Sequence, residues 1–155
     1  MAEAEELQSG GRERAPGPVV LAINICDTVI RDELTHKVSL IGLFGVIRAR
    51  TFPCRHPLMH IHVAMTGGHG KQDIEVRLVR IADEKPIMGV KGTMDFPDPL
   101  QVVELTFAWA NVGFEKPGEY AVEVSCGGNG VPLTSRKFNV VPLDADSPTR
   151  RGEET

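Results

Sequence analysis

Apolar residues alternate with polar ones along most of the chain, in short runs that glycine, proline, aspartate and asparagine separate. In residues 58–66 every second side chain, from Met59 to Met65, is apolar, and residues 72–81 and 101–110 repeat the pattern. A period of two places one face of a strand against a core and leaves the other face polar. Since no window of about ten residues shows a helical period, the pattern predicts an all-β protein.

These runs predict eight or nine strands. They cover residues 19–30, 37–43, 45–51, 58–66, 72–81, 87–96, 101–110, 119–126 and 131–141. The long first run is expected to bend near Cys26, and breaks are expected at Pro53, Pro57 and Pro86. Short strands at this spacing favour a two-sheet antiparallel β-sandwich, with a barrel of similar strand number as the alternative.

One turn sharpens the choice of fold. It contains Pro117 and Gly118 and leads into a strand that has Tyr120, the only tyrosine of the chain, near its start. This arrangement resembles the tyrosine corner of immunoglobulin-like and fibronectin-like sandwiches, in which the phenol bonds a backbone carbonyl of the preceding turn. Pro117, Gly118 and Tyr120 are therefore predicted structural residues. Val122 stands where an antibody domain has its second cysteine, so the prediction is such a sandwich without the disulfide.

Charge divides the chain into a neutral body and acidic ends. The 155 residues contain 17 Lys and Arg and 21 Asp and Glu, a formal net charge of −4. Residues 1–18 and 142–155 each carry two basic and four acidic residues, which leaves 13 of each kind in residues 19–141. We predict disordered tails at 1–18 and 142–155 around a single domain at 19–141. A neutral body favours self-association and offers no field that would hold nucleic acid or an anionic membrane.

The ends and the cysteines bear on the compartment. The first residues contain no basic segment followed by an apolar run, and no apolar stretch reaches the roughly 18 residues of a membrane span. Cys26, Cys54 and Cys126 are odd in number and form no C-x-x-C motif. We therefore expect a cytoplasmic protein with reduced, buried thiols and no membrane association.

Several distinctive segments resemble one known family. They are Cys26-Asp27-Thr28-Val29-Ile30-Arg31-Asp32-Glu33, Lys37-Val38-Ser39-Leu40-Ile41-Gly42-Leu43-Phe44, Phe52-Pro53 with His56-Pro57, Asp98-Pro99-Leu100 and Pro117-Gly118-Glu119-Tyr120. Together they are similar to a family of small bacterial proteins described as a domain of unknown function, over about residues 21–141. The resemblance implies a bacterial origin and a compact β-rich domain, and it implies no activity, ligand or catalytic residue. His60 and His62 are not part of the shared pattern.

The best metal hint is the pair His60 and His62. Residues i and i+2 of a strand point to the same face, so two imidazoles could share one divalent ion. Met59 and Ile61 would take the core face and leave both histidines outside, however, and two ligands are fewer than the three or four that a site needs. Cys54 lies close by in the sequence, but no base with assured geometry stands beside it to activate its thiol.

Two charged pairs are candidate contacts for a partner. Glu75 and Arg77 occupy the polar face of a half-buried strand, and Asp27 and Arg31 lie in the densest charged cluster. For that cluster the alternative interpretation, which the sequence favours, is turn chemistry at Asp32 and Glu33 with a cross-strand ion pair, for example to Lys37. Because no catalytic set converges, the sequence favours a non-enzymatic binding or assembly module without a cofactor, whose partner is a protein or a second copy. The alternative is a small metal-binding protein or metalloenzyme centred on His60 and His62.

Overall fold

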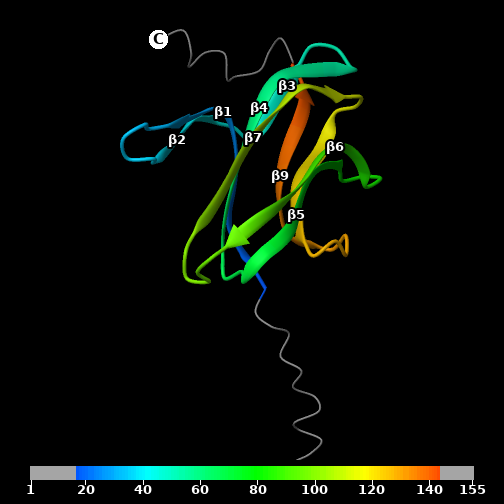
Figure 1. The fold of residues 1–155 in the computed structure, drawn as a ribbon. Helices are drawn as coiled ribbons and strands as arrows, with labels where there is room; N and C mark the ends of the chain where they lie inside the picture. The colour runs from blue at the N-terminus through cyan, green and yellow to red at the C-terminus, as the bar shows by residue number, and fades with distance from the viewer. Residues whose placement is uncertain (1–16, 144–155) are drawn as a thin grey trace, which may run out of the picture.

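Two β-sheets pack face to face in the computed structural model, which describes residues 17–143 (Figure 1). Every regular element in that range is a strand, so the predicted all-β sandwich is confirmed. The predicted tails at 1–18 and 142–155 lie outside the described residues, apart from the few positions that flank the first and last strands.

Nine strands follow one another along the chain. They are β1 (Val19–Arg31), β2 (Val38–Leu43), β3 (Val46–Ala49), β4 (Cys54–Thr66), β5 (Gly70–Arg80), β6 (Lys85–Phe96), β7 (Val103–Phe114), β8 (Gly118–Cys126) and β9 (Pro132–Pro142). The first sheet has the order β2-β1-β4-β7, and the second has the order β3-β9-β8-β5-β6. All neighbours are antiparallel except β3 and β9, which are parallel.

The alternating apolar positions form the core between the sheets. Met59, Ile61, Val63 and Met65 of β4 are fully buried, as are the inward residues Val76 and Leu78 of β5 and Val122 and Val124 of β8. At one end the rings of Phe114 and Tyr120 meet edge to face, with centroids 4.9 Å apart, and Phe138 packs beside both. Burial of these side chains is the main stabilising contribution to the fold.

Two prolines do not break strands as the sequence predicts. β4 runs through Pro57 and pairs with β7 on both sides of it. β1 pairs with β4 only as far as Cys26 and His60, so β4 has an open edge at Pro57, where a missing N–H costs no ladder bond. Pro86 lies inside β6, which is itself an edge strand.

β1 changes partner half-way along its length. Its first half pairs with β4 up to Cys26, and from there its second half pairs with β2 instead. The switch falls at the bend that the sequence predicts near Cys26. Residues 27–43 therefore form a two-stranded ribbon, here called the β1–β2 arm, which projects from the sandwich on the left of Figure 1.

Candidate binding surface

The β1–β2 arm exposes apolar side chains along its length. Leu34 at its tip is 92% exposed, Leu43 at its base is 60% exposed, and Ile30 and Ile41 are each 49% exposed. A two-stranded ribbon on its own is marginally stable in water, since it has no layer to pack against. The arm thus exposes more apolar surface than a ribbon packed against a second layer would.

The tip of the arm is built by local turn chemistry. The carboxylate of Asp32 accepts hydrogen bonds from the backbone N–H groups of Thr35 at 2.7 Å and Leu34 at 2.9 Å. These bonds, that of Thr35 first, hold the pKa of Asp32 below its ordinary value. Within residues 17–143 no ion pair joins Asp32 to Lys37, so of the two features in the alternative interpretation only the turn is present.

Asp27 and Arg31, two of the predicted contact residues, lie on the arm and are exposed. Asp27 folds over Gly42 of β2, where an added Cβ would lie 2.5 Å from its carboxylate oxygen. Gly42 also has a φ of 72°, a backbone conformation that favours glycine, and any side chain there would displace the carboxylate of Asp27. This glycine lets the side chain of Asp27 lie across the base of the arm.

A groove of about 780 Å³ separates the arm from the β6–β7 connection. Arg31, His36 and Lys37 line its arm side, and Asp95 and Glu104 line the other side. In the described part of the chain, neither Arg31 nor Lys37 takes part in an ion pair. The arm therefore offers apolar side chains next to cations that are available to an external carboxylate.

His60 and His62 lie on the outer face of the first sheet, as their alternation with the core residues predicts. The Nδ1 atom of His60 is 2.8 Å from the carbonyl oxygen of Asp27. His62 is buried between Asn24, whose Nδ2 donates to Nδ1 at 3.2 Å, and the Glu104 carboxylate, 3.7 Å from Nε2. Among residues 17–143 no group of three or more His, Cys, Asp or Glu side chains is arranged to hold a metal ion. The two rings are thus occupied by contacts within the sheet.

Glu75 and Arg77 lie on the outer face of the second sheet, and their charges are balanced by neighbours. Arg77 is 3.3 Å from Glu123 of β8 and 3.7 Å from Glu75, and Lys91 of β6 is 3.9 Å from Glu75. The Arg77–Glu123 and Lys91–Glu75 pairs join adjacent strands, and the Arg77–Glu75 pair lies along β5 itself. A partner at this face would have to compete with them, in contrast to the unpaired cations of the arm.

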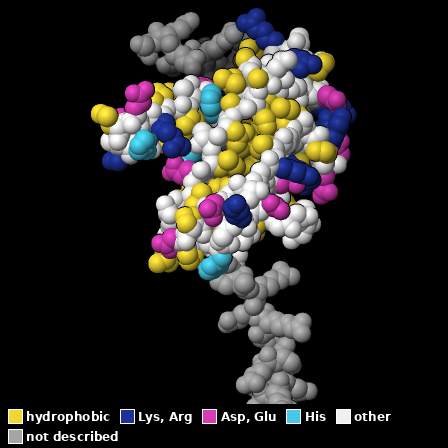
Figure 2. Space-filling view, viewed as in Figure 1, with side chains coloured by type: hydrophobic (Ala, Val, Ile, Leu, Met, Phe, Trp, Pro, Cys, Tyr) yellow, Lys and Arg dark blue, Asp and Glu magenta, His cyan; other side chains and the backbone are white. Residues whose placement is uncertain are grey.

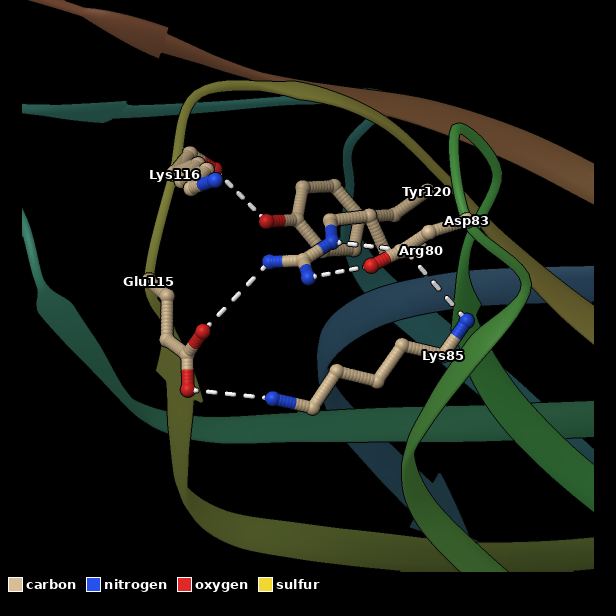
Figure 3. Close-up of polar contacts among 6 residues, drawn as sticks. All are labelled: Arg80, Asp83, Lys85, Glu115, Lys116 and Tyr120. Atoms are coloured by element: carbon tan, nitrogen blue, oxygen red, sulfur yellow. Dashed lines mark hydrogen bonds and ion pairs between the residues drawn. The ribbon is translucent and has the colours of Figure 1, made fainter.

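The tyrosine corner carries a cluster of charges that the sequence analysis missed (Figure 3). The phenol of Tyr120 donates to the Lys116 carbonyl oxygen at 2.6 Å, the contact that a tyrosine corner requires. Beside it, Arg80 bonds both carboxylate oxygens of Asp83, at 2.8 and 2.6 Å, and lies 3.5 Å from Glu115. The Arg80 guanidinium holds the pKa of the Asp83 carboxyl well below its usual range.

Glu115 joins two turns of that cluster. Its carboxylate accepts a hydrogen bond from Lys85 at 3.2 Å, and this bond is the first cause of its lowered pKa. The β5–β6 and β7–β8 turns are thereby tied together. An Arg-x-x-Asp spacing at a turn was the one signal in the sequence, but the partner Glu115 is 35 residues from Arg80 and only the topology brings them together.

Among residues 17–143 no neighbour of the three cysteines activates a thiol. Of the three thiols that we expected to be buried, only Cys26 is, because Cys54 and Cys126 are half-buried. Partial or full burial raises the pKa values of all three. Arg55, next to Cys54, donates instead to the Asn111 carbonyl oxygen at 3.3 Å. These thiols therefore stay protonated at neutral pH, which is typical of structural cysteines.

The family comparison decides what this chain is related to. The model of a family of unknown function, DUF6941, matches residues 21–141, which are nearly all of the two sheets. The chain belongs to DUF6941. The family resemblance expected from the segments around Asp27 and Tyr120 is therefore confirmed. No curated protein matches the chain.

Solved structures similar to this DUF6941 chain share little sequence with it. The CARDB domain of a Pyrococcus furiosus protein, solved with di-metal ions, has 17% identity and a TM-score of 0.40 over 83% of this chain and 96% of that one. The alkylpurine DNA glycosylase AlkC of Pseudomonas fluorescens, bound to DNA containing an abasic site analogue, has 11% identity and a TM-score of 0.44 over 77% of this chain. A β-glucosidase from Kluyveromyces marxianus has 15% identity and a TM-score of 0.40 over 70%. The match spans only 30% of the glycosylase and 16% of the β-glucosidase. No helix of the DUF6941 chain within residues 17–143 is long and apolar enough to cross a membrane.

Proposed function

We propose that this chain is a non-enzymatic protein-binding module and that the β1–β2 arm is its contact surface. The observation that carries the proposal is the exposure of Ile30, Leu34 and Ile41 on a ribbon that no other layer covers within residues 17–143. Protein interfaces have apolar centres surrounded by polar groups, and the arm has this composition.

The charges of the arm define the chemistry of the partner. Arg31 and Lys37 flank the apolar residues and make no ion pair in the described part of the chain. Asp27 and Glu33 on the same arm likewise make none there, so a fitting partner presents an apolar patch with charges of both signs beside it, including carboxylates that face Arg31 and Lys37. Such charges would steer the encounter and fix the orientation, while the apolar contact would supply most of the affinity.

The experiment is a quantitative affinity purification from the native host at native expression, with the wild type compared with Ile41→Lys. Ile41 is half exposed, so a lysine there leaves the fold intact and places a charge within the apolar contact. Thr93→Lys, an exposed position on β6, is the matched control. Arg77→Ala tests the alternative surface on the second sheet.

The proposal expects one protein that is recovered near stoichiometry with the wild type and with Thr93→Lys and is lost with Ile41→Lys. Loss with Arg77→Ala instead would move the contact surface to the second sheet and overturn the assignment to the arm. Recovery of the bait alone would argue against a binding module and direct attention to His60 and His62 as metal ligands.

A further inference from the structure

The edges of the two sheets differ in how they are protected against pairing with another strand. The second sheet ends in β6, which carries Pro86, Lys91 and Asp95, and in β3, which has only four residues. Proline, charged side chains and short length are the usual means by which proteins protect an edge. Both edges of the second sheet are therefore protected against pairing with a further strand.

The first sheet ends in β2 and β7, and Glu104 near the start of β7 is the only charged residue of these two strands. No charged residue and no proline occurs in residues 38–43 or in residues 105–114. Along β7 this leaves ten consecutive uncharged residues whose outer backbone edge pairs with no strand within residues 17–143. A long, apolar open edge of this kind is a template for an added strand.

Apolar surface adjoins this edge. Met88 and Val90 of β6 and Leu105 and Phe107 of β7 are half-buried or exposed and face one another across the open side of the sandwich. We call these four residues the β6–β7 seam. Figure 2 shows apolar surface gathered in the middle of the view, between β7 and the strands of the second sheet. A strand added to β7 would cover this seam as well as satisfy the backbone groups of the edge.

We propose that β7 pairs antiparallel with β7 of a second copy of this chain, around a twofold axis. The two four-stranded sheets then become one continuous sheet. A twofold interface requires a surface that is complementary to itself, and an uncharged strand meets this requirement because no like charges face each other. The neutral body, with 13 basic and 13 acidic residues in 19–141, adds no long-range repulsion.

We place the twofold axis between Phe107 and its counterpart in the second copy, which fixes the register of the pairing. Phe107 then lies opposite its own copy, and Leu105 lies opposite Trp109 of the second copy. These side chains are on the seam face of β7, where aromatic and apolar cross-strand pairs stabilise a sheet. Glu104, the charged residue near the start of β7, would face Ala110 instead of its own counterpart. The proposal is independent of the contact proposed for the arm.

Sedimentation equilibrium of the full chain, over a wide concentration range, tests the proposal. The central variants are Ala108→Lys and Ala108→Glu. Ala108 is exposed on the outer face of β7, and its counterpart across the axis is a diagonal neighbour within reach of a long side chain. Each variant alone should raise the dissociation constant of the dimer about fivefold or more, and an equimolar mixture of the two should restore it. Thr93→Lys on β6 should leave it unchanged.

Amide hydrogen exchange gives a second readout that separates lost pairing from lost folding. In Ala108→Lys, the edge-facing amides of residues 103–111, which this register pairs, should exchange faster, while those of β5 and β8 keep their protection. A chain that is monomeric at every concentration would overturn the proposal. So would a dimer that Ala108→Lys does not weaken, or a mixture of the Lys and Glu variants that stays monomeric.

Discussion

The tyrosine-corner end of the sandwich and the β1–β2 arm are both built from turns between strands, but they are stabilised differently. At the corner, Tyr120 is fully buried and bonded to a backbone carbonyl, and Arg80, Asp83 and Glu115 tie two turns together. On the arm, residues 27–37 are almost all exposed, and the tip is held by bonds within its own turn.

The two regions differ in whether their charged side chains are ion-paired within the fold or available to a binding partner. At the corner every charged group in Figure 3 except Lys116 has a partner of opposite sign. On the arm, Arg31 and Lys37 have none among the described residues, and they lie beside exposed apolar side chains. We therefore interpret the corner as structural, and this contrast supports the proposal that the arm is the contact surface.

The largest effect is expected from Tyr120→Ala at the corner. Loss of a fully buried aromatic ring that packs against Phe114 and Phe138 should lower the free energy of unfolding by about 3–5 kcal/mol. Urea unfolding followed by circular dichroism measures this. A loss below about 1 kcal/mol would contradict the view that the corner holds the two sheets together.

Tyr120→Phe isolates the hydrogen bond from the packing of the ring. The variant keeps the ring and removes the donor of the part-buried bond to the Lys116 carbonyl, which should cost about 0.5–1.5 kcal/mol of unfolding free energy. The same urea titration applies, with Phe138→Leu as a packing control that leaves the bond intact. If Tyr120→Phe were as stable as the wild type, the phenol bond would be incidental to the corner.

The corner shows how far the sequence could predict the structure. The hydrogen bond of Tyr120 is local, because its acceptor lies four residues earlier in the chain. The turn with Pro117 therefore predicted it. The alternation in β4 and β5 likewise marked the inward residues, because a strand must place every second side chain on the core. Arg80 and Glu115 could not be paired from the sequence, since their contact depends on the order of strands in the second sheet.

The arm shows the opposite case. Residues 38–43 look like an ordinary half-buried strand, and nothing local reveals that β1 leaves β4 after Cys26. For the same reason the sequence predicted that Pro57 would break a strand. β4 tolerates Pro57 because β1 no longer pairs with β4 there, which only the tertiary structure shows. The sequence alone also could not show that a candidate contact residue such as Arg77 is already ion-paired, because this depends on the positions of neighbouring strands.

Acid should remove the stabilisation that Asp83 and Glu115 give to the tyrosine corner. The pKa values of Asp83 and Glu115 are lowered in the folded chain, so their contribution is present above the ordinary carboxylate range and is lost as pH falls through the lowered values. The difference in melting temperature between the wild type and the double variant Asp83→Asn, Glu115→Gln should therefore be positive at pH 7 and shrink toward zero in acid.

Asp32→Asn is the control for this titration, because the pKa of Asp32 is also lowered but its bonds lie within the arm. Its effect on the melting temperature at pH 7 should be smaller than that of the double variant at the corner. A difference for the double variant that grows in acid would reverse the sign and refute the assignment of these carboxylates as stabilising.

The smallest effect on stability is expected at the tip of the arm. Leu34 is 92% exposed, so Leu34→Ser removes almost no buried surface and should change the free energy of unfolding by less than about 0.5 kcal/mol. The same substitution takes away the most exposed apolar side chain that a partner could cover, so recovery of the partner should fall. A variant that unfolds more readily and still retains its partner would invert the comparison, because the tip would then stabilise the fold and contribute little to binding.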